Sequence, residues 1–266
     1  MWSRRIALGA VLLSLAFVAF LILRDGPVGR APAERAAAVP RTPVTAPRPH
    51  IVSRAVWHAD ESLVREKPHY TGAARAVFIH HTGHGNRYDC DDAPEMLRSV
   101  QSDHVGAEGW DDIGYNFVVD RCGTIYEGRA GGVTRPVRGA HTKGFNTDTV
   151  GIAALGTFDA GTPVPRPMLD AIAKVAAWKL APGIDPRGSV RLVSTNDESL
   201  FDKGEAAMLH VVSGHRDSYE TDCPGDALYG KLPALREQTA ALRKAATGRA
   251  DAATAASAAS ARAAVH

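Results

Sequence analysis

Short apolar runs alternate with amphipathic segments through the middle of this chain, and the alternation restricts the fold more than any other feature. The apolar runs are rich in β-branched and aromatic residues and are typical of buried strands; they cover residues 77–79, 117–119, 124–126 and 150–155. Asp120-Arg121-Cys122-Gly123 predicts a hairpin turn between the second and third runs. Val211-Val212 indicates the end of another strand, and residues 190–193 could form an extra one.

Three segments between these runs have helical spacing and helix boundaries. The first begins at Pro94, the second ends at Pro182-Gly183 and the third begins near Pro233. Their stripes are Met96, Val100 and His104; Leu169, Ile172 and Ala176; and Leu235, Thr239 and Leu242. Strands interspersed with helices predict an α/β fold, a single domain with a central mixed β-sheet flanked by about three helices.

Both ends of the chain differ in composition from this domain, which we expect over residues 50–245. Residues 24–49 are mainly Ala, Pro and Arg with few large apolar side chains, and we expect a disordered tether there. Residues 246–266 are mostly alanine with no apolar stripe that could dock a helix, so we expect a disordered tail. Residues 184–210 suggest no function.

The N-terminus has the pattern of an export signal. Arg4 and Arg5 precede a run from Ile6 to Leu23 that contains no charged residue. The run is long for a signal peptide and close to bilayer-spanning length, so residues 1–23 fit a cleaved signal peptide and a membrane anchor through residues 6–23 equally well. In both cases the domain is expected outside the cytoplasm, secreted or anchored, where disulfides persist.

His80, His215 and Cys223 have the residue types and spacing of a metal site with an open position. His80 ends an apolar strand, and Gly214-His215-Arg216-Asp217 is followed shortly by Thr221-Asp222-Cys223-Pro224-Gly225. Three protein ligands leave a fourth position for water or a substrate carbonyl, as in catalytic zinc sites. Neighbours on a strand point to opposite faces, so His81 is expected to face away from the metal as a satisfied second-layer or core histidine.

Cys223 has two other interpretations. It could be a nucleophile activated by His215, although no papain-like signature surrounds it. It could also form a disulfide with Cys90 or Cys122. Alternatively, Cys90 and Cys122 bond each other and leave Cys223 free as a thiolate ligand, which accounts for all three cysteines.

A series of motifs resembles, in order, those of peptidoglycan recognition proteins and the related phage-lysozyme-type N-acetylmuramoyl-L-alanine amidases. The match runs from about Ile51 to Arg243. It comprises Ser53-Arg54-Ala55-Val56-Trp57, His80-His81-Thr82, the stretch from Trp110 to Phe117, Tyr126-Glu127-Gly128-Arg129, Gly139-Ala140-His141-Thr142, Phe145-Asn146, Gly151-Ile152 and the two motifs around His215 and Cys223.

The resemblance implies a zinc amidase that cleaves the amide between N-acetylmuramic acid and L-alanine in peptidoglycan. His80, His215 and Cys223 would hold one zinc ion per domain. Tyr115 would hydrogen-bond the attacking water or the developing oxyanion, although it could also be a core aromatic. Thr221 lies where some phage-type members have a catalytic lysine, which leaves acid catalysis at that position in doubt. His104, His141 and Asn146 match positions that line the groove for muramyl peptide.

Other functions remain as alternatives. Family members with a broken zinc shell, typically with Ser for the Cys, bind peptidoglycan without cutting it, and Cys223 argues against that here. A Cys-dependent hydrolase and a wall-associated structural protein are further alternatives. The formal net charge of +2 and the scattered basic residues argue against a nucleic-acid partner. We expect a monomer whose partner is peptidoglycan.

Overall fold

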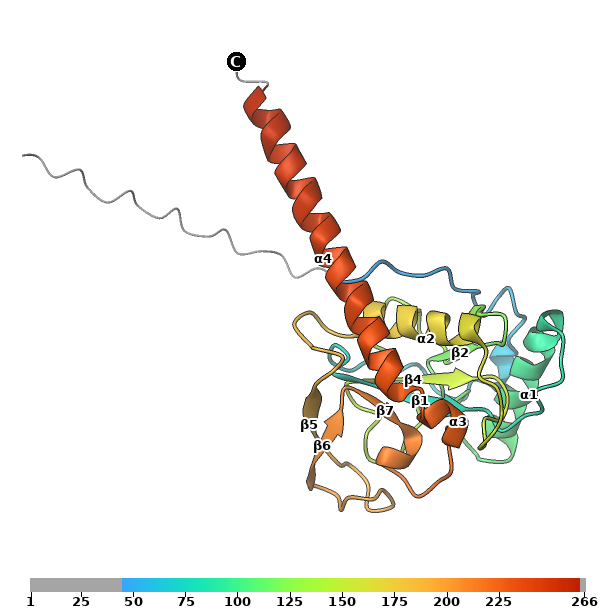
Figure 1. The fold of residues 1–266 in the computed structure, drawn as a ribbon. Helices are drawn as coiled ribbons and strands as arrows, with labels where there is room; N and C mark the ends of the chain where they lie inside the picture. The colour runs from blue at the N-terminus through green and yellow to red at the C-terminus, as the bar shows by residue number, and fades with distance from the viewer. Residues whose placement is uncertain (1–44, 264–266) are drawn as a thin grey trace, which may run out of the picture. The chain divides into compact units, whose positions relative to one another are not determined.

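A five-stranded mixed sheet lies at the centre of the computed structural model, which describes residues 45–263 (Figure 1). Its strand order is β3-β2-β4-β1-β7. β1 pairs in parallel with β4 and β7, β2 pairs in parallel with β4, and only β3 is antiparallel to its neighbour. The strands are β1 Ala76–His81, β2 Phe117–Val119, β3 Ile125–Glu127, β4 Thr149–Ala154 and β7 Val212–Gly214. The predicted mixed sheet and its five strands are confirmed.

Parallel pairing brings the C-terminal ends of β1, β4 and β7 to the same edge of the sheet. Ile79 is in register with Gly214, so the residues that follow, His80 and His215, lie side by side at this edge. His80 is also in register with Ala153 of β4. Loops at the carboxyl ends of parallel strands commonly form the sites of α/β proteins.

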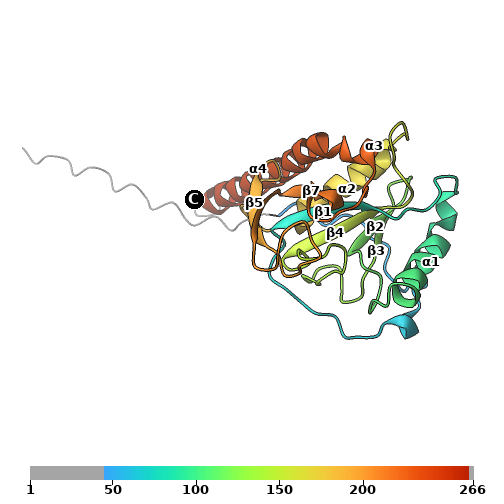
Figure 2. The same cartoon turned by 90° about the horizontal axis from the view of Figure 1, so that it is seen from below.

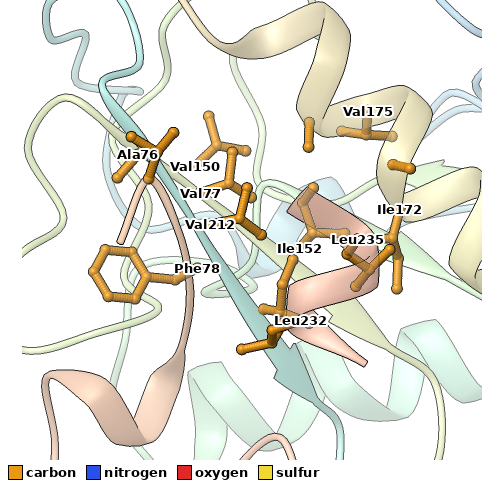
Figure 3. Packing of buried hydrophobic residues seen from close by; sticks show 14 of the residues in the cluster. Ala76, Val77, Phe78, Val150, Ile152, Ile172, Val175, Val212, Leu232 and Leu235 are labelled. Carbon is orange, nitrogen blue, oxygen red and sulfur yellow. The ribbon is translucent and has the colours of Figure 1, made fainter. Parts of the chain in front are cut away.

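Helices cover both faces of the sheet, α2 and α4 on one and α1 on the other (Figure 2). Figure 3 shows Ile152 of β4, Ile172 of α2 and Leu235 of α4 packed closely together in the larger core. A smaller core under α1 includes Leu97, Val118 and Ala153. The helices are α1 Ala93–Gly106, α2 Arg166–Lys179, α3 Asp226–Tyr229 and α4 Leu232–Ala263. The three expected helices are present, and the short α3 is an addition.

The buried face of α1 differs from the predicted stripe. Val100 is buried, but Met96 and His104 are only partly buried, and the most buried positions include Leu97 and Gln101. His104 therefore lies at the edge of the packed face. This position leaves its ring available to the surface beside the sheet.

Residues between α2 and β7 form a separate two-stranded hairpin. The expected strand at residues 190–193 is β5 (Ser189–Val193), and it pairs with β6 (Ala206–His210) in antiparallel fashion. β6 was not predicted. Its side chains alternate in burial, with Ala207 and Leu209 buried and Met208 exposed, but an apolar residue on the exposed face leaves the stretch Ala-Ala-Met-Leu-His with weak alternation of apolar and polar residues.

The Cys90–Cys122 disulfide is present and Cys223 is a free, buried cysteine. The bridge joins the start of the α1 segment to the turn between β2 and β3, 32 residues apart in sequence. It confirms the pairing that leaves Cys223 available as a ligand. The interpretation in which Cys223 joins a disulfide is therefore wrong.

The C-terminal segment differs from expectation, because α4 continues to Ala263 where we expected a disordered tail from Ala246. Ala246 itself is buried beside Ala46 and Ala177. Beyond it, the described side chains from Asp251 to Ala258 are exposed. Alanine has the highest helix propensity, and a helix already docked through its first turns adds residues without a new nucleation cost.

The expected signal or anchor at residues 1–23 and most of the tether at 24–49 lie outside the described residues. Residues 45–49 of the tether have no regular secondary structure. None of the helices within residues 45–263 combines the length and apolarity needed to cross a bilayer.

Candidate metal centre and cleft

Two imidazoles and one thiol converge at the C-terminal edge of the sheet. His80 is the next-to-last residue of β1, His215 opens the 3-10 helix η3 (His215–Asp217) directly after β7, and Cys223 lies in the loop before α3. One ligand atom from each of the three lies within 4.8 Å of the other two. His80 Nδ1 is 3.8 Å from Cys223 Sγ, and the rings of His80 and His215 have centroids 4.5 Å apart.

The loop from His215 to Cys223 is held by its own hydrogen bonds. The Arg216 N–H donates to Cys223 O at 3.0 Å, and the Arg216 guanidinium binds Asp226 at 2.6 Å and also donates to Asp222 O. Gly225 follows with φ +86° and lies so close to Phe158 that a Cβ there would meet the Phe158 carbonyl oxygen at 2.3 Å. Glycine is therefore required in this turn.

The electrostatics of the cluster suit a metal rather than an acid-base pair. Burial, together with the neighbouring His215 and His141, holds the pKa of His80 well below its ordinary value. Burial lowers the pKa of His215 to about 4 and raises the pKa of the Cys223 thiol to about 12. Neutral imidazoles present lone pairs to a metal, and a metal ion would displace the thiol proton on binding.

This donor set fits zinc. Nitrogen and sulfur ligands in a three-residue shell are typical of zinc sites that keep one position open. Two tetrahedral zinc ligands, one nitrogen and one sulfur, lie about 3.6 Å apart, close to the 3.8 Å between His80 Nδ1 and Cys223 Sγ. The spacing of these two donor atoms is thus already close to what a shared zinc ion requires.

Tyr115 lies beside the cluster, as the sequence predicted. Its ring centroid is 5.3 Å from that of His80, and its hydroxyl donates to His81 O at 3.3 Å. Burial raises the pKa of Tyr115, with the neighbouring Cys223 adding to the effect, so the hydroxyl keeps its proton at neutral pH. A protonated phenol beside the cluster can donate a hydrogen bond to a reacting oxygen.

An open cleft of about 560 Å³ adjoins the cluster. His215 lines both the cleft and the cluster, so a molecule in the cleft can reach the candidate metal position. The cleft is lined by His104, Glu108, Trp110, Ala140, His141, Thr142, Lys143, Asn146, His215 and Tyr219. Cys223 is not among these residues and is only 8% exposed.

His104 lies in the cleft wall with one nitrogen already engaged. Its Nδ1 accepts the Gly114 N–H at 3.1 Å, and its ring packs against Trp110 in a tilted arrangement with centroids 4.6 Å apart. Burial lowers the pKa of His104 to about 4, so the ring is neutral and its single proton is on Nε2. His104 can therefore donate one hydrogen bond from Nε2.

The other predicted site residues, His141, Asn146 and Thr221, use their polar side-chain atoms in hydrogen bonds within the protein. His141 lines the cleft but is only 3% exposed, and its ring nitrogens contact His80 Nε2 at 3.2 Å and Thr149 Oγ1 at 3.4 Å. Asn146 Oδ1 accepts the N–H groups of His141 and Thr142. Thr221 Oγ1 accepts the Cys223 N–H at 3.2 Å and Thr221 is not a cleft residue. Both ring nitrogens of His141 are therefore engaged within the protein, while its predicted contact with muramyl peptide stays a prediction.

His81 is absent from the metal cluster, in agreement with strand alternation. It is not a satisfied histidine, however, because its Nδ1 is buried with no hydrogen-bond partner among residues 45–263. Its backbone contributes instead: the His81 N–H donates to Cys223 Sγ at 3.3 Å and its carbonyl accepts from Tyr115.

The sequence did not single out Trp110, Tyr219 or Thr149. Tyr219 stacks on His215 with ring centroids 5.3 Å apart and an interplanar angle of 12°. Trp110 opens a motif already used for Tyr115, and its position beside that motif is a usable signal. Nothing in the local sequence marks Thr149, because its role depends on a contact with His141 across the fold.

Comparison with known proteins places these residues in a family. Residues 70–226 match the N-acetylmuramoyl-L-alanine amidase family model. Peptidoglycan-recognition protein LB of Drosophila melanogaster is 31% identical over 184 residues, which is 68% of this chain and 67% of that protein. The N-acetylmuramoyl-L-alanine amidase of Sus scrofa is 34% identical over 161 residues, 59% of this chain but only 22% of that longer protein.

Solved structures agree with the sequence relatives. The human PGRP-IBETAC structure in complex with glycosamyl muramyl pentapeptide superposes with a TM-score of 0.51 and 29% identity, covering 69% of this chain and 94% of that chain. The matched family region contains every candidate ligand as well as Tyr115 and the cleft residues. The chain belongs to the N-acetylmuramoyl-L-alanine amidase family that includes the peptidoglycan recognition proteins.

Proposed function

We propose that this protein is a zinc-dependent N-acetylmuramoyl-L-alanine amidase that hydrolyses the amide between N-acetylmuramic acid and L-alanine in peptidoglycan. The observation that carries the proposal is the cluster of His80, His215 and Cys223 at the side of the cleft. A relative with the name of this activity and a structural neighbour bound to a muramyl pentapeptide support the choice of substrate.

His80, through Nδ1, together with His215 and Cys223 would hold the zinc ion. Bound zinc supplies Lewis-acid polarisation of the scissile carbonyl and a lowered pKa for the attacking water. The protein supplies a rigid donor set, because His80 lies on a paired strand, His215 directly follows one and the Cys223 loop is fixed by Arg216.

Tyr115 is the donor that we assign to the developing oxyanion. Its present hydrogen bond to His81 O is 3.3 Å long, outside the usual range for a hydroxyl donor, so turning the proton toward a substrate oxygen sacrifices little. The high pKa of Tyr115 makes it a hydrogen-bond donor and not a base at neutral pH.

His104 is the substrate-positioning residue that the geometry favours in the cleft wall. Its Nε2–H can donate to a substrate carbonyl while Nδ1 stays bound to Gly114. We assign Thr221 no part in proton transfer, since its hydroxyl oxygen accepts the Cys223 N–H and steadies the ligand loop.

A recognition module that binds peptidoglycan without cleaving it is the second candidate, because several relatives are peptidoglycan recognition proteins by name. The complete His-His-Cys set favours turnover over binding alone. A Cys-dependent hydrolase is disfavoured, because Cys223 is buried away from the cleft and burial raises its pKa to about 12.

The test is digestion of purified peptidoglycan by the full chain, with and without a zinc chelator. We expect new L-alanine N-termini that the chelator abolishes and added zinc restores. Cys223→Ser should lose turnover while it still binds muramyl peptide. Peptidoglycan binding without new L-alanine termini in the zinc-loaded protein would establish the recognition module instead, and full activity of Cys223→Ser would overturn the zinc assignment.

A further inference from the structure

Three buried side chains form a continuous hydrogen-bonded chain that ends at the candidate metal position. Thr149, His141 and His80 are 2%, 3% and 1% exposed, so water has almost no access to the groups that connect them. The links are Thr149 Oγ1 to His141 Nε2 at 3.4 Å and His141 Nδ1 to His80 Nε2 at 3.2 Å. Thr149 is the first residue of β4 and His80 lies within β1, so the sheet fixes both ends.

Thr149 determines which group donates and which accepts in each of these hydrogen bonds. Its hydroxyl has one proton and lies 2.5 Å from the Phe145 carbonyl oxygen. A carbonyl can only accept, so the Thr149 proton is committed to Phe145 and the hydroxyl oxygen is left as an acceptor. His141 Nε2 must then carry the proton that it shares with Thr149.

The same argument fixes the proton positions on the rings of His141 and His80. Burial of an imidazole favours its neutral form, which has one N–H and one lone pair. With the proton of His141 on Nε2, its Nδ1 is the acceptor, so His80 Nε2 must be the donor between the two rings. The lone pair of His80 is then on Nδ1, the nitrogen that lies 3.8 Å from Cys223 Sγ.

We propose that Thr149 and His141 are positioning residues that hold His80 in the tautomer with its proton on Nε2, so that Nδ1 presents a lone pair to the metal. The inference rests on the proposed zinc site, and it assigns His141 to the layer beneath the metal ligands and not to the substrate. In the opposite tautomer His80 would direct an N–H at the metal position and face the lone pair of His141 with one of its own.

The first test needs neither zinc nor substrate. In metal-free wild-type protein with ¹⁵N-labelled histidine, the ring nitrogen shifts identify the tautomer of each histidine. We expect His80 and His141 both to carry the proton on Nε2. A spectrum in which His80 carries its proton on Nδ1, or exchanges between tautomers, overturns the proposal even if the enzyme is active.

The second test measures Zn²⁺ affinity by competition with a chelator in matched variants. Thr149→Val removes the hydroxyl at nearly constant volume and should weaken zinc binding roughly 10- to 100-fold, the usual effect of losing an outer-shell partner. Thr149→Ser restores the hydroxyl and should recover most of the affinity. Thr239→Val is the control, because Thr239 is fully buried and its hydroxyl has no hydrogen-bond partner among the described residues.

These measurements separate the inference from the proposed function. Loss of zinc affinity in Thr149→Val but not in Thr239→Val, together with a shift of the His80 tautomer, supports the positioning role. Wild-type affinity and an unchanged His80 tautomer in a folded Thr149→Val protein contradict it. A wild-type protein that shows the expected tautomers but releases no L-alanine termini would contradict the amidase proposal alone.

Discussion

The surroundings of the Tyr115 hydroxyl and the Cys223 thiol determine the protonation state of each group. Both are buried beside the same backbone segment: the His81 carbonyl accepts from Tyr115, and the His81 N–H donates to Cys223 Sγ. Burial raises the pKa of each, so neither group ionises near neutral pH without a metal. A bound cation would affect both groups. It would displace the thiol proton of Cys223, and it would hold the developing negative charge of a substrate oxygen near the hydroxyl of Tyr115.

Tyr115→Phe tests the catalytic assignment at this scale. The change keeps the ring contacts with His80 and His104 and removes only the hydroxyl. If that hydroxyl stabilises the oxyanion, turnover should fall roughly 100-fold or more with little change in apparent substrate affinity. Steady-state kinetics on a soluble muramyl peptide, with zinc content measured in parallel, provide the check.

The opposite kinetic pattern would move Tyr115 out of catalysis. Near-normal turnover with weakened binding would place it in the wall of the cleft. Loss of zinc from Tyr115→Phe would instead show that its hydroxyl supports the Cys223 segment.

The sequence predicted which residues gather at the site better than it predicted what each one does. Residue type and motif position were enough to identify the candidate ligands and the hydroxyl donor, which are His80, His215, Cys223 and Tyr115. The position of His141 is also visible in the sequence, but its partners are not, since Thr149 and His80 reach it only after β1 and β4 pair. Hydrogen-bond partners of a side chain are set by the tertiary fold and cannot be read from local spacing.

Among the elements, Arg243 of α4 binds the C-terminal end of α2. Arg243 donates to the carbonyl oxygens of Ala177, Leu180 and Ala181 at 2.8 to 2.9 Å. These carbonyls lie at and just beyond the end of α2, where no further helical N–H groups are available to them. A cation there also interacts favourably with the helix dipole.

Arg243→Ala should therefore destabilise the protein by about 2 kcal/mol, the range for hydrogen bonds with a charged partner. Denaturant unfolding gives the free energy directly. Arg249→Ala is the matched control, because Arg249 lies on the same helix with an exposed side chain and should change stability by less than about 0.5 kcal/mol. Equal effects of the two substitutions would show that Arg243 contributes only to the helix and not to its attachment.

The elements that the sequence predicted correctly are those with a strong pattern. β1, β2 and β4 are almost wholly buried and read as continuous apolar runs. β6 was missed because a two-stranded hairpin with an exposed face needs little apolar sequence. The end of α4 was missed because no apolar stripe marks it. Helix propensity and continuation from a docked segment extend the helix to Ala263.

For the whole molecule, the three candidate ligands join segments far apart in sequence. His80 lies on β1, between β4 and β7 in the sheet. His215 and Cys223 flank the turn that connects β7 to α3. An ion held by all three would bind the native state and not the unfolded chain. Zinc binding is therefore coupled to folding.

We predict that zinc raises the thermal stability of the metal-free protein by an amount that grows with the logarithm of the ratio of free zinc to the Kd. At a free zinc concentration of 1,000 times the Kd, linkage contributes about 4 kcal/mol, which corresponds to an increase in Tm on the order of 10 °C for a domain of this size. Cys223→Ser should show a much smaller increase at the same zinc concentration. Thr149→Val should lie between the two, because its ligands are intact but His80 is no longer held in one tautomer. Thermal unfolding monitored by circular dichroism across a zinc series measures all three proteins without any assay of activity. If zinc leaves the Tm of the wild-type protein unchanged across that series, the three side chains do not form a zinc site in the native state, whatever the protein does to peptidoglycan.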